Sequence, residues 1–266
     1  MVQLPLLPER IYSKTAGLKW TCDDVGMSES TVLLFDNMVL KIEKISRYSK
    51  YEHGLLGWLA GKLPVPKIIE AQEQDGNSFL LMSRLPGEMT CSESSLQNIE
   101  DTVKALAKGL KMIWKIDITN CPYLNNVPEK ILQANYNIEN NLFDMGGVNP
   151  ETFTSEGFKN VSELYEYLDQ NRPKEDLVFS HGDFCLPNVF ISGNDITGFI
   201  DWGRGGIADR WQDIALCIHS LRYNCIEYAL CDKEKCQEYE NLLFQELAIE
   251  PDKEKIRYFI LLDELF

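Results

Sequence analysis

Positive charge is scarce in this sequence. Lys and Arg number 26 against 41 Asp and Glu, so the formal net charge is −15 at pH 7. A surface this acidic repels nucleic-acid phosphates and anionic lipid headgroups, and we therefore expect neither nucleic acid nor a membrane as a partner. Among partners, a cation fits such a surface better, although solubility alone is the simplest explanation of the acidity.

The acidic excess is confined to one part of the chain. Residues 1–90 contain 11 acidic and 10 basic residues, whereas residues 91–266 contain 30 and 16. Such an asymmetry suggests two regions with different tasks. The first region can face an anion, and the second can attract a cation.

Several signals of other protein classes are missing. No run approaches the ~18 apolar residues of a membrane-spanning helix, and residues 1–11 do not resemble a signal peptide. There are three histidines, and the eight cysteines include no Cys-x-x-Cys pair, so zinc-ribbon spacing is absent. Cys225, Cys231 and Cys236 cluster in the sequence without a histidine at ligand spacing. We therefore expect reduced thiols in a cytoplasmic protein.

The first 90 residues are dominated by short β-prone runs. Asp36-Asn37 is a turn signal between two of these runs and predicts a hairpin. The chain then breaks at residues 84–87, Arg-Leu-Pro-Gly, where we place a linker. The predicted strands are residues 31–35, 38–42 and 79–82, and one helix is predicted over residues 48–60.

Helical periods dominate beyond the linker. Apolar residues at 4-3-4-3 spacing between Ile99 and Ile113 predict one face of a long amphipathic helix. Residues 120–156 are rich in Asn, Gly and Pro and predict irregular structure. Strands followed by helices indicate an α+β fold with a small, mostly-β lobe (residues 1–84) and a larger, mostly helical lobe (residues 85–266). Further helices are predicted over residues 161–170, 209–230, 233–248 and 252–265.

A strand pair inside the helical half carries the most informative residues. Residues 189–191 and 196–200 flank Ser-Gly-Asn-Asp (192–195), a strong turn signal. Counting outward from this turn predicts that Asn188 lies opposite Asp201, on the same face. An amide oxygen and a carboxylate brought together in this way suit a hard cation, particularly Mg²⁺.

Asp183 precedes Asn188 by five residues. The intervening loop can hold Asp183 close to that cation while its carboxylate orients or deprotonates a hydroxyl that attacks a metal-bound phosphate. Asp and Asn also cap turns at strand ends. A capping role would explain any one of Asp183, Asn188 and Asp201. It explains the presence of all three at this spacing less easily.

Lys41 adds a fourth component. It lies in an apolar strand, where a lysine is usually an edge residue, but Glu52 on the following helix can hold it so that the two position phosphates. Backbone N–H groups of the loop Gly26-Met27-Ser28 can contact the same phosphates. Neither a P-loop nor a Gly-x-Gly-x-x-Gly motif is present.

The order of these parts resembles that of the kinase-like phosphotransferases. His-Gly-Asp (181–183) and Ile-Asp-Trp-Gly (200–203) stand where protein kinases have His-Arg-Asp and Asp-Phe-Gly. Within that group, the chain resembles the aminoglycoside 3'-phosphotransferase family over nearly its whole length. The matching segments are residues 62–67, 181–188, 198–204, 208–215 and 261–266.

The resemblance implies a bilobal, protein-kinase-like fold with the nucleotide bound at the hinge. Asp183 would be the catalytic Asp, and Asn188 and Asp201 would hold Mg²⁺. The implied ATP-binding residues are Gly26, Met27, Ser28, Lys41, Glu52, Ser83 and Leu85, the last two through their backbones. The implied substrate-binding residues are Glu151, Arg204, Asp263, Glu264 and Phe266.

The implied activity is Mg²⁺-dependent transfer of the γ-phosphate of ATP, or of GTP, to the 3'-hydroxyl of kanamycin- and neomycin-type aminoglycosides, which confers antibiotic resistance. The protein would act as a monomer or a weak dimer. Two alternatives stay open: a kinase of the same fold for another cation or polyol, such as choline or a ketosamine, and a non-catalytic nucleotide-binding module. Departures from the family pattern at His219, Tyr223 and Asn224 bear on the substrate range.

Overall fold

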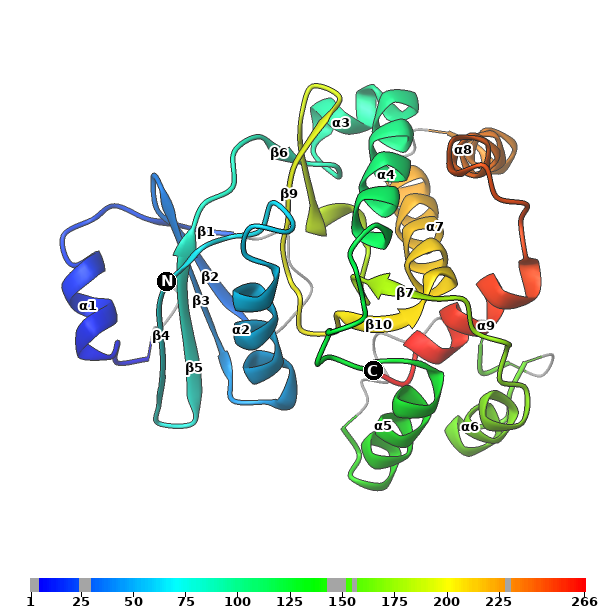
Figure 1. Ribbon diagram of the computed structural model, residues 1–266, viewed down its shortest axis with the longest axis horizontal. Helices are drawn as coiled ribbons and strands as arrows, with labels where there is room; N and C mark the ends of the chain where they lie inside the picture. Colours follow the sequence, from blue (N-terminus) through cyan, green and yellow to red (C-terminus); the bar gives the residue numbers. More distant parts are fainter. Residues whose placement is uncertain (1–4, 24–29, 143–151, 155–156, 228–230) are drawn as a thin grey trace.

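The computed structural model describes residues 5–23, 30–142, 152–154, 157–227 and 231–266. A five-stranded sheet comes first along the chain, and helices predominate after it (Figure 1). The prediction of an α+β fold with a sheet-rich first part and a helical second part is confirmed.

The first part is an antiparallel sheet with strand order β1-β2-β3-β5-β4. Helix α1 lies on its outer side, and α2 lies on the side that faces the rest of the molecule (Figure 1). The elements are α1 (Glu9–Thr15), β1 (Thr21–Cys22), β2 (Thr31–Leu34), β3 (Met38–Lys44), α2 (Arg47–Leu59), β4 (Ile68–Gln74) and β5 (Asn77–Ser83).

The alternation of side chains along β3 decides which residues face inward. Leu40 and Ile42 are buried in an apolar cluster that includes Ile11 of α1. Because successive strand residues point to opposite faces, Lys41 and Glu43 project from the other face, toward α2. The apolar pattern of one strand therefore places a lysine in the interior of the molecule.

Helix α2 begins with a capping box. Ser46 Oγ accepts a hydrogen bond from Ser49 N at 3.1 Å, and Ser49 Oγ accepts one from Ser46 N at 3.0 Å. The capping box gives hydrogen-bond partners to N–H groups at the start of the helix. It also fixes the residue at which the helix begins, and so which side chains face inward. Glu52 lies six residues after the cap Ser46, on the buried face with Leu55 and Leu56.

The second part begins where the chain leaves the sheet after Ser83. Strand β6 belongs to a different sheet, with order β6-β8-β9, and β7 pairs with β10. The elements are β6 (Glu88–Met89), α3 (Glu93–Gln97), α4 (Ile99–Trp114), α5 (Val127–Glu139), α6 (Val161–Gln170), β7 (Leu177–Ser180), a 3₁₀ turn (Leu186–Asn188), β8 (Val189–Ser192), β9 (Asp195–Phe199), β10 (Gly206–Asp209), α7 (Arg210–Glu227), α8 (Lys233–Leu247) and α9 (Lys253–Asp263).

Helix α4 is the centre of the helical part. Val103, Leu106, Leu110 and Ile113, predicted to form its apolar face, are fully buried. The helix packs against α7 and α8, so the 4-3-4-3 pattern marks the core of this part (Figure 1). No helix in the described parts of the chain combines the length and the apolar character needed to cross a membrane. The eight cysteines are all described, and none forms a disulfide.

Helix α5 lies in the segment predicted to be irregular, so that prediction is wrong there. Asn126 caps the helix by accepting a hydrogen bond from Glu129 N, and a proline occupies its first turn. Its buried face includes two polar residues, Lys130 and Asn137. The apolar period is interrupted at these positions, which hid the helix in the sequence.

Lys255 ties α9 to the end of β10 and gives a test of the fold. Its Nζ lies 2.7 Å from Oδ2 of Asp209, whose side chain is fully buried. We predict that Lys255→Met lowers the free energy of unfolding by about 3 kcal/mol, because Asp209 loses its countercharge in the interior. Urea unfolding at pH 7 measures the effect, with the exposed Lys253→Met as the control. A loss no larger than that of the control would contradict the prediction.

Candidate active site

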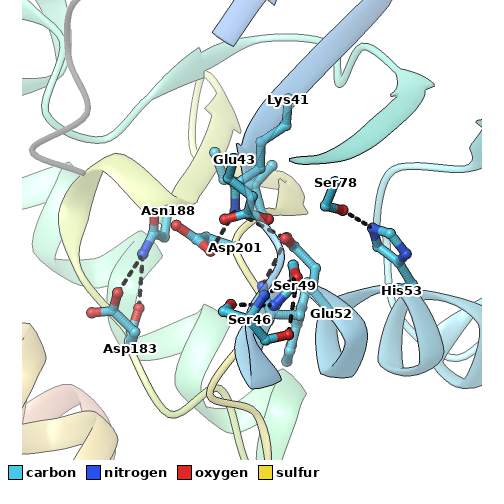
Figure 2. A network of polar contacts seen from close by, with 12 residues as sticks. Lys41, Glu43, Ser46, Ser49, Glu52, His53, Ser78, Asp183, Asn188 and Asp201 are labelled. Atoms are coloured by element: carbon cyan, nitrogen blue, oxygen red, sulfur yellow. Dashed lines mark hydrogen bonds and ion pairs between the residues drawn. The ribbon is translucent and has the colours of Figure 1, made fainter. Parts of the chain in front are cut away.

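Lys41 is surrounded by acidic side chains. Its Nζ lies 2.9 Å from Glu52 Oε2, 3.1 Å from Asp201 Oδ1 and 3.7 Å from Glu43 Oε2. Figure 2 shows Lys41 reaching from β3 toward Glu52 on α2 and toward Asp201. The pairing with Glu52 that the sequence predicts is present, and Asp201 shares the same ammonium group.

Burial and neighbouring charges together set the protonation of this group. Burial alone would lower the pKa of Lys41, but the carboxylates of Glu52 and Asp201 outweigh it and raise the pKa above its ordinary value. Burial raises the pKa of Glu52, and Lys41 opposes the rise. At Asp201 the ammonium of Lys41 outweighs burial, so the pKa lies below its usual value. Lys41 is therefore a cation and Asp201 an anion at neutral pH.

Asn188 links Asp183 to this charged group. Its amide nitrogen donates to the backbone oxygen of Asp183 at 3.0 Å and to Asp183 Oδ2 at 3.3 Å. Figure 2 shows Asn188 between Asp183 and Asp201. Because the amide nitrogen is turned to Asp183, the amide oxygen is the atom that Asn188 presents to a cation. That oxygen and the carboxylate of Asp201 fit the ligands that Mg²⁺ prefers.

The predicted opposition of Asn188 and Asp201 is wrong by one residue. The tight turn pairs Ser192 with Asp195, and one bulge further along adds a single residue to β9. Ile200 N consequently donates to Asn188 O at 3.0 Å, so Ile200 is the residue opposite Asn188. Asp201 follows with a left-handed φ of 61°, outside the strand.

Asp213, in the first turn of α7, fixes the backbone just before Asp183. Its carboxylate accepts hydrogen bonds from Ser180 Oγ at 2.8 Å, His181 N at 3.0 Å and Gly182 N at 2.9 Å. Asp213 is fully buried, and burial raises its pKa while the hydrogen bonds oppose the rise. Asp213 thus acts on Asp183 through the main chain and does not contact its carboxylate.

Gly182 allows this loop to approach the segment after Asp201. The antiparallel pairing of β7 with β10 sets Ser180 opposite Gly206. Gly182 has a φ of 83°, and a Cβ atom there would lie 1.8 Å from the backbone oxygen of Arg204. A residue without Cβ is therefore required for the two backbones to meet.

A cavity of about 330 Å³ lies between the five-stranded sheet and the β8 region. The backbone N–H of Ser83 is not available to a ligand, because it donates to Lys67 O at 2.9 Å. Asp183 is outside the lining, beside Asn188. The predicted residues in the lining are Lys41, Glu52, Ser83, Leu85, Asn188 and Asp201. The predicted residues Gly26, Met27, Ser28 and Glu151 lie outside the described residues.

The residues predicted to bind the substrate are divided between two places. Arg204 Nη1 donates to Asp263 Oδ1 at 2.7 Å, and the guanidinium carbon lies 5.6 Å from the centre of the Phe266 ring. Glu264 instead accepts a hydrogen bond from Thr152 Oγ1 at 2.8 Å and lines a separate cavity of about 1130 Å³. Consecutive residues at the end of α9 therefore face different surroundings.

The sequence interpretation missed three residues of the site. Glu43 follows Lys41 by two positions, and the period of a strand could have placed both on one face. Asp213 lies in a matching segment, but its contact with the His181 loop depends on the fold. Lys130 belongs to the unpredicted helix α5. It is 3% exposed, and its Nζ lies 4.8 Å from the centre of the Phe266 ring.

Comparison with known proteins gives a consistent family pattern. A model of the phosphotransferase enzyme family matches residues 23–258. An aminoglycoside 3'-phosphotransferase from Enterococcus faecalis is 39% identical over 262 residues, which cover 93% of this chain and 94% of the relative.

Two solved structures show the same fold. The crystal structure of an aminoglycoside 3'-phosphotransferase of type VIII has a TM-score of 0.81 and 25% identity, and 97% of each chain is covered. The aminoglycoside phosphotransferase APH(3'')-Id from Streptomyces rimosus, in complex with ADP and streptomycin, has a TM-score of 0.78 and 20% identity over 96% of this chain and 95% of that one.

Lys130 provides a stability test of the site. Burial and the nearby charge of Arg204 lower its pKa to about 8. The unfolded chain then binds more protons than the folded chain between about pH 8 and pH 10.5, so this lysine destabilises the fold below pH 8 and less as the pH rises. We predict that Lys130→Met raises the free energy of unfolding by up to about 3 kcal/mol at pH 7 and by clearly less at pH 9.5.

Urea unfolding of Lys130→Met and the wild type at both pH values measures this difference. The same change at the exposed Lys174 is the control, for which we expect a difference within about 0.5 kcal/mol at either pH. A Lys130→Met variant less stable than the wild type at pH 7 would show that the lysine is well compensated.

Proposed function

Because the chain belongs to the aminoglycoside 3'-phosphotransferases, within the phosphotransferase enzyme family, we propose that it transfers the γ-phosphate of ATP to the 3'-hydroxyl of aminoglycoside antibiotics and thereby confers resistance. The observation that carries this proposal is the convergence of Lys41, Asn188 and Asp201 on one cavity, with Asp183 beside Asn188. The four side chains combine a phosphate-binding cation, oxygen ligands for a metal and a carboxylate for the attacking hydroxyl.

We propose that the nucleotide occupies the 330 Å³ cavity between two lobes, residues 1–84 and 85–266. Its lining supports this division, since it combines residues of β2, β3 and β5 with residues near β8 and β9. The Ser83 carbonyl and the Leu85 N–H would contact the base. The loop of Gly26, Met27 and Ser28 would cover the phosphates.

Lys41 would bind the α- and β-phosphates while Glu52 holds its ammonium in place. Asn188 and Asp201 would bind Mg²⁺, which when bound neutralises phosphate charge. Asp201 Oδ1 lies 3.1 Å from Lys41 Nζ. The Asp201 carboxylate would therefore contact both the lysine and the bound metal. Charge stabilisation by groups already fixed in position would supply most of the acceleration.

Asp183 would orient the acceptor hydroxyl and take up its proton as the bond to phosphorus forms. The contacts from Asn188 and Cys185 restrict the rotation of its carboxylate. Asp213 keeps the backbone of this loop fixed through Gly182. Precise orientation matters because the reacting oxygen and phosphorus must approach in line.

The acceptor would bind on the other side of Asp183, near the end of α9. Asp263, Phe266 and Arg204 form a connected group there, whereas Glu264 would contact a different part of the substrate from the larger cavity. Glu151 is a further candidate contact. We also propose that the enzyme acts as a monomer or a weak dimer.

We predict that Asp183→Ala lowers kcat by about 10²–10⁴-fold, because the acceptor hydroxyl loses its proton acceptor and its orientation. Nucleotide affinity should change little, since Asp183 does not line the cavity. Steady-state kinetics and a fluorescent-nucleotide titration measure the two quantities. Asp195→Ala, which removes an exposed carboxylate, is the control. A kcat within tenfold of the wild type would rule out this role for Asp183.

A substrate panel with Mg²⁺ and ATP or GTP tests the acceptor. We expect turnover of kanamycin- and neomycin-type compounds, and a kcat/KM at least about 100-fold lower for 3'-deoxy analogues, because the site then has no hydroxyl to activate. Product analysis by NMR identifies the phosphorylated oxygen. Turnover of choline or a ketosamine without any aminoglycoside would support the alternative kinase. Equal turnover of 3'-deoxy compounds would refute the 3' assignment, unless NMR shows that those products carry the phosphate on the 5''-hydroxyl as an alternative target.

A further inference from the structure

Three cysteines meet where α7 ends and α8 begins. One sulfur atom from each of Cys225, Cys231 and Cys236 lies within 4.8 Å of the other two. Cys225 comes from the last turns of α7, and Cys236 from the first turn of α8. The spacing of these residues in the sequence matches no metal motif, and the fold alone creates the group.

The spacing of the sulfurs suits a common ligand. A metal ion with three thiolates at ~2.3 Å, arranged in a plane, needs sulfurs about 4 Å apart. The three sulfurs therefore have to move by less than about 1 Å, and a larger ion needs even less movement. The three thiols already face one another, since each sulfur lies within 4.8 Å of the other two.

The surroundings favour a soft ion. Cys225 is fully buried, Cys236 is 4% exposed and Cys231 is half-buried, so an ion can enter past Cys231 into a mostly dry site. Glu240, one turn after Cys236, is held by two hydrogen bonds from Arg222 at 2.6 and 2.8 Å. Among the described residues, no histidine or carboxylate joins the thiol group. Ligands made only of sulfur select thiophilic ions over Mg²⁺ or Ca²⁺.

We propose that Cys225, Cys231 and Cys236 form a three-thiolate site for a soft divalent d¹⁰ cation of the Zn²⁺ and Cd²⁺ class. Binding forms three metal–sulfur bonds and releases three protons from the thiols. The complex carries one net negative charge, and Arg222, which is paired with Glu240 one turn after Cys236, is a cation close to this side of the group. The bound ion would cross-link the end of α7 to the start of α8.

Cd²⁺ titration of the reduced full-length protein, with Mg²⁺ present in excess, tests the site. We expect the ultraviolet charge-transfer band of cadmium thiolate to saturate at one equivalent. Cys231→Ser should lower the affinity at least tenfold, and Cys91→Ser, which changes a partly buried cysteine outside the group, should leave it unchanged. Zn²⁺ in large excess should compete for the site and weaken the band.

Thermal unfolding gives a second readout that does not depend on the band. At free Cd²⁺ about one hundred times the wild-type Kd, Tm of the wild type should rise by about 5–10 °C, and Tm of Cys231→Ser should rise by at most about half as much. Equal Cd²⁺ binding by the wild type, Cys231→Ser and Cys236→Ser would overturn the proposal. So would a wild-type protein that shows no saturable band.

Discussion

The buried positive charge of Lys41 is the constraint on which the site depends. Its side chain is 12% exposed, and the Glu52 side chain beside it is 2% exposed, so neither charge can be left without the other. Lys41 comes from β3, Glu52 from α2, and Asp201 from the chain that follows β9 in the second part. One ammonium group therefore fixes how a strand, a helix and a distant turn approach each other. On the proposed function, the same charge balance prepares the cavity for an anionic nucleotide, because the cation is held in place before any phosphate arrives.

A second buried charge organises the other half of the site through the main chain. Asp213 binds the backbone N–H groups of His181 and Gly182, and the close approach of Gly182 to Arg204 aligns this loop with the segment after Asp201. Asp183, which follows β7, and Arg204, which precedes β10, thereby acquire fixed positions at one end of this strand pair. The Lys41 ion pairs, which join the two parts, and the hydrogen-bonded carboxyl group of Asp213 thus hold the reacting groups with little reliance on flexible side chains.

The features predictable from the sequence were those encoded by local periodicity. The β2–β3 hairpin, helix α4 and the pairing of Lys41 with Glu52 follow from period-two and period-3.6 patterns, and the resemblance of the motifs supplied the family. The failures arose where tertiary structure overrides the local pattern. Helix α5 buries polar residues that interrupt its apolar face. In the β8–β9 hairpin the tight turn alone would pair Asn188 with Phe199, and the bulge moves its partner to Ile200, one residue short of the predicted Asp201. The separation of Glu264 from Asp263 depends on the phase of the last turn of α9, which no spacing argument resolves.

The acidic excess of the second part of the chain does not extend to the surroundings of Asp183, where positive and negative side chains are balanced. Lys130 and Arg204 lie close enough to affect the acidic residues there, and Arg204 already occupies a carboxylate oxygen of Asp263. The acceptor side is therefore locally balanced, although residues 91–266 carry 30 acidic and 16 basic residues. On the proposed function, the excess would act mainly over distances near the Debye length of ~10 Å, where it would accelerate capture of a polycation. Placement of the acceptor in the site would depend on short-range contacts instead. An amine of the acceptor that binds Asp263 must compete with the guanidinium of Arg204. Capture and selection would then depend on different charges, and only capture would weaken strongly with salt.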